Sequence, residues 1–278
     1  MKIGTERLLD GGYIAVRSGK IDPRRKTLVF LHGLAGSSSA WDRIAALGFS
    51  GFNTILLDLR GHGISHRYQA VDDYRIELIA NDVIRVLREL HITQPIFVAH
   101  SFGCLIALTC VAQREFTSSK LILLSPGYPR PHSVLATVLD CLLKAAACII
   151  RRTRVERQGG RVNYDKYPKN TDYNPRRMAA DIHNTGGLVY LSCIRWALSA
   201  DMTSLLSQLE GISVLLVHGK RDSVFPIRAA QKIKDRVRQS QLVTIDDGNH
   251  VLPLTHPEQL HAIITVFLAE EDFCEGVA

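Results

Sequence analysis

The stretch Pro95-Ile96-Phe97-Val98-Ala99-His100-Ser101-Phe102-Gly103 decides the fold of this 278-residue chain. Its apolar first half predicts a buried strand over 95–100, and the apolar run after it predicts a helix over 102–114. Ser101 lies at the reversal between the two, with small residues two positions before and two positions after it. A turn this tight admits only small side chains at those positions and raises the serine hydroxyl above the sheet edge. The pattern therefore indicates a nucleophilic serine.

Two further side chains follow strands later in the chain. The run Val214-Leu215-Leu216-Val217 leads into His218-Gly219-Lys220-Arg221-Asp222, which puts a carboxylate just past a strand. The run 241–245 leads into Gly248-Asn249-His250. A serine hydroxyl needs a base whose pKa lies near 7, and histidine meets that need without large perturbation. We therefore predict His250 as the base and Asp222 as the acid that orients it.

Other residues near these strand ends are weaker candidates. Asp246 and Asp247 lie too close in sequence to His250 to be the favoured orienting acid, and the strand ending at Ser125 offers no carboxylate. His32 and His100 adjoin the turns on either side of the serine, so we interpret both as structural.

An upstream loop supplies the remaining part of the predicted site. Thr27-Leu28-Val29-Phe30-Leu31 runs into His32-Gly33-Leu34-Ala35-Gly36, a buried strand that opens into a glycine-bearing loop. Such a loop can aim backbone N–H groups at a developing oxyanion. The N–H groups of Leu34 and Phe102 are the predicted oxyanion donors.

The order serine, acid, histidine resembles that of the α/β-hydrolase superfamily. Asp58-Leu59-Arg60-Gly61-His62-Gly63, after the strand near 53–58, also looks like the loop that follows the fourth strand in that superfamily. The resemblance covers nearly the whole chain outside a central segment. It implies an α/β fold with a mostly parallel eight-stranded sheet, helices on both faces and an inserted helical cap. The expected division is a core of 1–126 and 205–278 and a cap of 127–204.

Hydrophobic periodicity gives the approximate positions of the elements. The expected strands are 5–9, 12–18, 27–32, 53–58, 95–100, 121–125, 213–218 and 241–246. The expected core helices are 37–47, 75–91, 102–114, 227–237 and 257–270. Asn174-Pro175 is expected to open a helix in the cap, which continues in pieces through Trp196.

The segment 133–150 predicts a long apolar helix with one narrow polar stripe. Its length suits a membrane span, but Asp140 and Lys144 lie centrally and would each cost ~3 kcal/mol in a bilayer. We expect this helix to cover an apolar substrate pocket, with Phe102, Trp196, Val224 and Val251 near its mouth. The alternative is an interfacial helix that touches an anionic membrane through 133–157.

Charge is concentrated in one part of the chain. Of the net charge of +7, residues 144–177 account for all, with ten Lys and Arg against three acids. We interpret these residues as a solvated face or as a surface for an anionic membrane or substrate, and we expect no nucleic-acid partner. The six cysteines show no C-x-x-C pair, so no disulfide framework, metal site or cofactor is expected. Residues 1–7 are followed by no apolar stretch, which predicts a cytoplasmic protein.

The resemblance and the predicted triad together favour a serine hydrolase of carboxylic esters with an apolar acyl or alkyl group. The same machinery serves thioesterases, lipases at a membrane interface and hydrolases of carbon–carbon bonds next to a ketone, so these alternatives stay open. Receptor or scaffold relatives usually lack a triad member, and none is missing here. The sequence does not indicate an oligomeric state.

Overall fold

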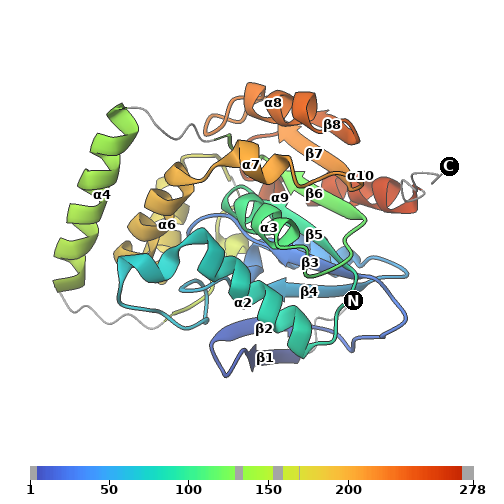
Figure 1. The fold of residues 1–278 in the computed structure, drawn as a ribbon, viewed down its shortest axis with the longest axis horizontal. Coiled ribbons are helices and arrows are strands. Elements are labelled where there is room, and N and C mark those ends of the chain that lie inside the picture. The colour runs from blue at the N-terminus through green and yellow to red at the C-terminus, as the bar shows by residue number, and fades with distance from the viewer. Residues whose placement is uncertain (1–4, 129–133, 153–158, 169, 271–278) are drawn as a thin grey trace.

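The computed structural model describes residues 5–128, 134–152, 159–168 and 170–270. Within them, eight strands form one sheet in the order β1-β2-β4-β3-β5-β6-β7-β8 (Figure 1). β1 pairs antiparallel with β2, β2 pairs antiparallel with β4, and every later pair is parallel. The strands are β1 (Thr5–Leu9), β2 (Ile14–Ser18), β3 (Thr27–Leu31), β4 (Asn53–Leu57), β5 (Pro95–His100), β6 (Lys120–Leu124), β7 (Ser213–Gly219) and β8 (Ser240–Ile245).

The central strands are buried on both faces, as expected of parallel strands covered by helices. All residues of β3, β4, β5 and β6 are buried. One face packs against α2 (Ile76–Glu89), α3 (Phe102–Ala112) and α8 (Arg228–Arg236). The opposite face packs against α1 (Asp42–Leu47) and α10 (Pro257–Ala269). The predicted eight-stranded α/β architecture is confirmed, and each predicted strand and core helix is present to within a few residues.

The long connection between β6 and β7 holds α4 (Val134–Arg152), α5 (Pro175–Thr185), α6 (Gly187–Ser199) and α7 (Met202–Leu206), with a 3-10 turn, η3, at Tyr164–Lys166. α4 lies outermost and packs on α6, which in turn contacts the 3-10 turn η2 (Val71–Tyr74) (Figure 1). No helix among the described residues is long and apolar enough to cross a membrane. The remaining short elements are η1 (Ser38–Trp41) and α9 (Leu252–Thr255).

A buried carboxylate links this connection to the core. Asp58, which is fully buried after β4, accepts hydrogen bonds from the backbone N–H of Ser38 at 2.7 Å and of Ile64 at 3.0 Å. The guanidinium of Arg161 also donates to Asp58, at 2.9 Å from Nε. Arg161 belongs to the basic segment that we interpreted as a solvated face. It is instead an internal counter-ion, because a buried carboxylate needs paired donors.

Candidate active site

Ser101 lies at the turn from β5 to α3, in a backbone conformation rare for non-glycine residues. Its φ is 50° and its ψ is −112°. The turn is held by the N–H of Ser101, which donates to the carbonyl of Leu124 on β6 at 3.0 Å. A Cβ at Gly103 would lie 2.5 Å from the carbonyl oxygen of Leu31, so only glycine fits there. This is the local geometry that the small residues around Ser101 predict.

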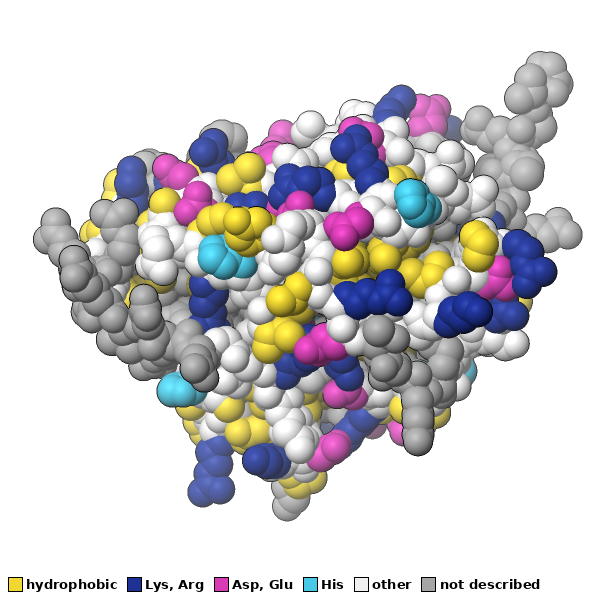
Figure 2. Space-filling view, turned by 90° about the horizontal axis from the view of Figure 1, so that it is seen from below, with side chains coloured by type: hydrophobic (Ala, Val, Ile, Leu, Met, Phe, Trp, Pro, Cys, Tyr) yellow, Lys and Arg dark blue, Asp and Glu magenta, His cyan; other side chains and the backbone are white. Residues whose placement is uncertain are grey.

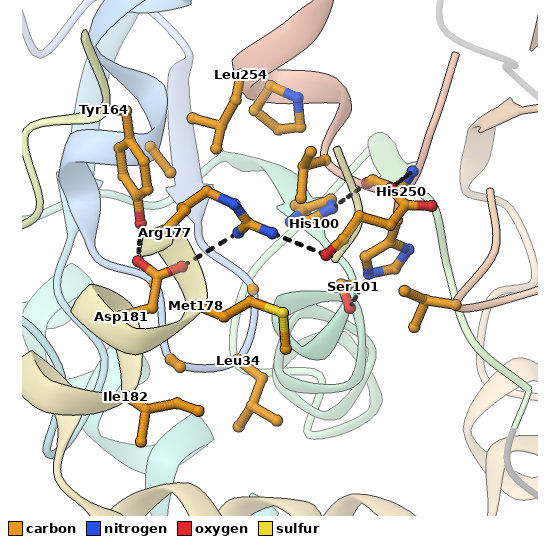
Figure 3. Close-up of a pocket in the computed structure, with 18 of the residues that line it drawn as sticks. Leu34, His100, Ser101, Tyr164, Arg177, Met178, Asp181, Ile182, His250 and Leu254 are labelled. Atoms are coloured by element: carbon orange, nitrogen blue, oxygen red, sulfur yellow. Dashed lines mark hydrogen bonds and ion pairs between the residues drawn. The ribbon is translucent and has the colours of Figure 1, made fainter. Parts of the chain in front are cut away.

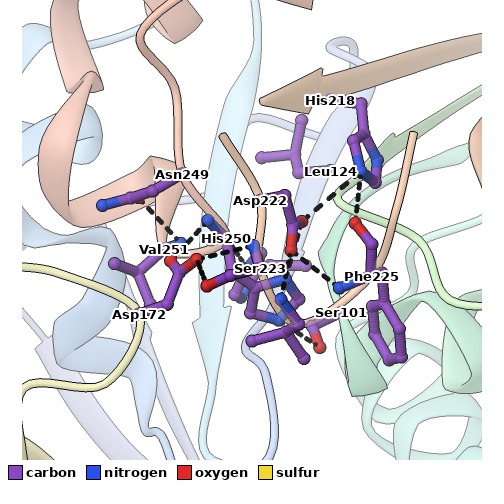
Figure 4. Close-up of polar contacts among 12 residues, drawn as sticks. Ser101, Leu124, Asp172, His218, Asp222, Ser223, Phe225, Asn249, His250 and Val251 are labelled. Carbon is purple, nitrogen blue, oxygen red and sulfur yellow. Dashed lines mark hydrogen bonds and ion pairs between the residues drawn. The ribbon is translucent and has the colours of Figure 1, made fainter. Parts of the chain in front are cut away.

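Three side chains from distant parts of the chain meet at this turn (Figure 4). Nε2 of His250 lies 3.0 Å from Oγ of Ser101, and Nδ1 of His250 lies 2.9 Å from Oδ2 of Asp222. An ionised carboxylate only accepts hydrogen bonds, so Nδ1–H donates to Asp222. Nε2 is then free to accept the serine proton. The structure thus brings together Ser101, His250 and Asp222 in the arrangement that the sequence predicts.

Asp222 is held as a carboxylate by several donors. Its Oδ1 accepts from the backbone N–H of Val224 at 2.9 Å and of Phe225 at 2.8 Å. Burial alone would raise the pKa of Asp222. The hydrogen bond and charge of His250 and the N–H of Phe225 outweigh burial, so the pKa is lowered. Asp222 therefore stays ionised when His250 needs its support.

The predicted oxyanion donors adjoin the serine. Phe102 is the first residue of α3, where a backbone N–H has no carbonyl partner within the helix. The loop that carries Leu34 approaches the serine so closely that a Cβ at Gly33 would lie 3.4 Å from Cβ of Ser101. Leu34 and Ser101 also line the same two cavities. Both residues thus lie next to Ser101, and their role as oxyanion donors stays a prediction.

The two histidines that we interpreted as structural make contacts of that kind. Nε2 of His100 lies 2.8 Å from the carbonyl oxygen of His250, to which it donates. Burial, followed by the charge of His250, lowers the pKa of His100 to about 3, so it stays neutral. Nδ1 of His32 lies 2.8 Å from the carbonyl of Gly33, and its Nε2 accepts from the N–H of Leu59. His32 therefore joins the oxyanion loop to the loop after β4.

Asp172 is a site residue that the sequence analysis missed (Figure 4). Its Oδ1 accepts from the backbone N–H of His250 at 2.6 Å. Its Oδ2 accepts from Ser223, at 2.8 Å from the backbone N–H and 2.6 Å from Oγ. One buried carboxylate from the connection thus bridges the loop of the base and the loop of the acid. Asp172 lies in a charged loop with no strand before it, so no local signal distinguishes it.

Two cavities open on either side of Ser101. The first has a volume of about 230 Å³. It is lined by Ser101 and His250, by the loop that carries Leu34 and by residues of α5 (Figure 3). The second has a volume of about 210 Å³ and is lined by apolar residues of α3, α6 and α7. Phe102 lines the second cavity, and Val224 and Val251 line the first.

One expectation about the pocket is wrong. Trp196 lines neither cavity, because its indole Nε1–H donates to the carbonyl of Val71 at 3.1 Å and its ring packs under Arg195. Of α4, the side chains described at 141–150 line neither cavity, whereas residues of α5 and α6 do. α4 packs on α6, and its role as a cover over the pocket stays a prediction.

The first cavity has a charged end. Nη1 of Arg177 lies 3.1 Å from Oδ2 of Asp181, and the hydroxyl of Tyr164 donates to Oδ1 of Asp181 at 2.9 Å (Figure 3). Nη2 of Arg177 donates to the backbone carbonyl of Asp172 at 2.9 Å. All of these groups are buried. Sequence reasoning counted Arg177 only as part of the basic segment.

Potential metal-ligating side chains do not cluster in the part of the chain that the structure describes. Within the described ranges, no group of three or more His, Cys, Asp or Glu side chains is placed to hold a metal ion.

Comparison with known proteins agrees with the fold. The model of a family described as the alpha/beta hydrolase family matches residues 28–263. The chain belongs to the alpha/beta hydrolase family.

Among curated relatives, Protein ABHD8 of Homo sapiens is 23% identical over 258 residues, which cover 88% of this chain and 55% of that protein. The chain therefore spans about half the length of these first relatives. The putative carbamate hydrolase RutD of Caulobacter sp. is 24% identical and covers 98% of this chain and 99% of its own length.

Solved structures share the fold along nearly the whole chain. A thermophilic esterase from Thermogutta terrifontis has a TM-score of 0.71 and 21% identity, and the match covers 95% of this chain and 97% of that one. A hydrolase from Pseudomonas aeruginosa has a TM-score of 0.75 and 17% identity, with 96% and 98% covered.

Proposed function

We propose that this chain is a serine hydrolase that cleaves carboxylic esters through an acyl-enzyme on Ser101. One observation carries the proposal. The Ser101 hydroxyl lies 3.0 Å from a histidine whose other nitrogen is held at 2.9 Å by a buried, ionised aspartate. That chain of contacts is what activates a serine hydroxyl at neutral pH.

The proposed reaction follows from these contacts. As Oγ of Ser101 bonds to the carbonyl carbon, its proton passes to Nε2 of His250, and Asp222 stabilises the imidazolium. The N–H groups of Leu34 and Phe102 receive the oxyanion, and loss of one such donor typically costs ~3 kcal/mol. The intermediate then expels the alcohol, which takes the proton from His250. Water repeats the sequence on the acyl-enzyme, and the carboxylic acid leaves.

The cavities support a small substrate with an apolar part. Each is smaller than the ~300 Å³ at the lower end of typical ligand pockets. The second is lined by side chains such as Leu105, Ile194 and Met202. Its volume suits a short apolar acyl or alkyl group. The carbamate in the name of the RutD relative would undergo the same acyl transfer, so a carbamate belongs in the assay.

Covalent labelling tests the nucleophile. Intact mass after treatment with a fluorophosphonate should show one adduct, and Ser101→Ala should show none. Against p-nitrophenyl esters from acetate to palmitate, the short esters should be cleaved at least tenfold faster than palmitate. His250→Ala should lose nearly as much activity as Ser101→Ala, since the triad acts as a unit. Unchanged labelling of Ser101→Ala would refute the assignment.

A further inference from the structure

The first cavity ends at a buried guanidinium that is not fully paired. Arg177 is only 7% exposed and lies on the inner side of α5 (Figure 3). Its two terminal nitrogens donate to Asp181 and to backbone carbonyls of Thr171 and Asp172. Its Nε is buried and has no hydrogen-bond partner among the described residues. A guanidinium has five N–H donors, and these three bonds leave one N–H of Nη1 over besides that of Nε, so an acceptor in the cavity that Arg177 lines would gain from pairing with it.

The charges around this end argue against an anionic ligand. The acidic and basic side chains that line the cavity, apart from the histidines, are Asp172, Asp181 and Arg177, two carboxyl groups against one guanidinium. The two histidines of the lining are His250, which the triad uses, and His100, which burial keeps neutral. A ligand carboxylate would be a third anion beside one cation. Buried charges need partners of opposite sign, so this excess is unfavourable.

The opposite side of Ser101 has no comparable polar group. The second cavity is lined mainly by apolar side chains, and its only described polar side-chain groups are the hydroxyls of Ser101 and Tyr128 and the thiol of Cys104. The thiol donates inward, to the carbonyl of Ala99. The Tyr128 hydroxyl lies 3.0 Å from Oγ1 of Thr203. The two cavities therefore differ in polarity across the serine.

We propose that the Arg177 end of the first cavity binds an uncharged oxygen acceptor of the substrate, such as a ketone, amide or ester carbonyl, while the second cavity takes an alkyl or aryl group. The inference rests on the proposed ester hydrolysis at Ser101. It deepens that proposal by specifying a substrate with one polar, uncharged end and one apolar end. Arg177 is then a specificity-determining residue.

A matched series of esters tests the preference. Three substituents of equal length would be compared: one ending in a methyl ketone, one in an alkyl group and one in a carboxylate. Each substituent is placed once on the acyl side and once on the alcohol side, so that neither cavity is assigned in advance. In one of the two series, kcat/KM for the ketone ester should exceed that for the alkyl ester about tenfold, with the carboxylate ester slowest.

Variants on α5 assign the preference to Arg177. Arg177→Met should abolish the tenfold advantage of the ketone ester over the alkyl ester, measured as the ratio of the two kcat/KM values within the variant. Arg176→Met is the matched control, because Arg176 is the exposed neighbour on the same helix. That control should leave all ratios unchanged.

A second variant guards against misfolding of Arg177→Met, which leaves Asp181 buried without its cation. Asp181→Asn keeps Arg177 and removes one of the two carboxylates. It should raise kcat/KM for the carboxylate ester at least fivefold relative to the alkyl ester. A wild-type preference for the carboxylate ester, or equal rates for ketone and alkyl esters in both series, would overturn the inference. Fluorophosphonate labelling of Ser101, run in parallel, distinguishes that result from failure of the proposed hydrolysis itself.

Discussion

At the scale of single residues, Asp172 decides how firmly the base and the acid are positioned. Its carboxylate accepts three hydrogen bonds, one from the loop of His250 and two from Ser223. Asp172→Asn replaces one carboxylate oxygen, which accepts hydrogen bonds, by an amide NH2 group, which donates them. That NH2 group would face the backbone N–H of His250 or of Ser223, which is also a donor. We expect kcat for ester hydrolysis to fall about 100-fold with little change in KM, because small displacements of reacting groups are costly.

The control for Asp172 lies in the same segment. Asp165 is 77% exposed at its side chain and pairs with Arg43 at the surface. Asp165→Asn should leave kcat unchanged. Steady-state kinetics and the rate of fluorophosphonate labelling provide the readout, with thermal unfolding alongside. A lower melting temperature with an unchanged kcat would make Asp172 a purely structural residue.

The contrast between the triad and Asp172 shows which site residues a sequence reveals. Ser101 follows β5 directly, and Asp222 and His250 lie in the loops that follow β7 and β8, so a local pattern marks each of them. Asp172 has no such pattern, and its partners Ser223 and His250 are 51 and 78 residues away. Its position depends on how the connection folds over the sheet, which local periodicity does not encode.

At the scale of elements, the start of α5 agrees with the prediction from the sequence, but the residues that form its buried face do not fit the usual apolar pattern. Asn174 caps the helix by accepting from the N–H of Arg177, and Pro175 occupies the first turn. The buried residues, however, are Arg177, Asp181 and Thr185, a polar stripe at intervals of four. An apolar stripe normally marks the inner face of a helix. Periodicity alone therefore did not predict that α5 turns Arg177 and Asp181 inward.

The polar stripe of α5 predicts a pH dependence of stability. Burial raises the pKa of Asp181 from 3.8 to about 6, against the opposing effects of Arg177 and Tyr164. Because the folded-state pKa is the higher one, the native state binds the extra proton, and this contribution is present below pH 4 and lost as the pH rises through 6. Relative to Asp181→Asn, the wild type should lose about 2 kcal/mol of unfolding free energy between pH 4 and pH 7.

Urea unfolding at several pH values measures this difference. Asp181→Asn removes the titrating group and keeps the size of the side chain, so the difference between the two proteins isolates its contribution. Asp165→Asn again serves as the exposed control. Parallel pH profiles of wild type and Asp181→Asn would show that Asp181 does not titrate in this range.

At the scale of the whole molecule, less of the positive charge is free to attract anions at the surface than the composition suggests. Arg161 and Arg177, both from the basic segment 144–177, pair with buried carboxylates. On the face drawn in Figure 2, Lys and Arg are interspersed with Asp and Glu, and hydrophobic groups lie among them. Surface attraction to anions must therefore come from a limited part of the segment.

The exposed residues of α4, with the basic residues that follow them in the sequence, are the candidates for that part. Leu142 and Ile149 are 62% and 65% exposed, and Lys144 lies between them in sequence. Arg151, Arg152, Arg154 and Arg157 follow directly in the sequence, although their side chains fall outside the described residues. Exposed apolar groups beside basic residues are two weak membrane signals that add. We therefore propose that 133–157 contacts anionic membrane surfaces.

Sedimentation with vesicles tests this contact. Binding should appear with phosphatidylserine-containing vesicles, fail with phosphatidylcholine alone, and weaken between 0.1 M and 0.5 M salt, because each basic residue contributes ~1 kcal/mol that salt screens. The double change Leu142→Ser and Ile149→Ser should reduce binding at least fivefold. The matched control is Val266→Ser, since Val266 on α10 is also 65% exposed but lies apart from the basic residues. Equal failure to bind both kinds of vesicle at low salt would leave α4 as ordinary surface, whereas equal loss in both variants would show that the apolar contact is not specific to α4.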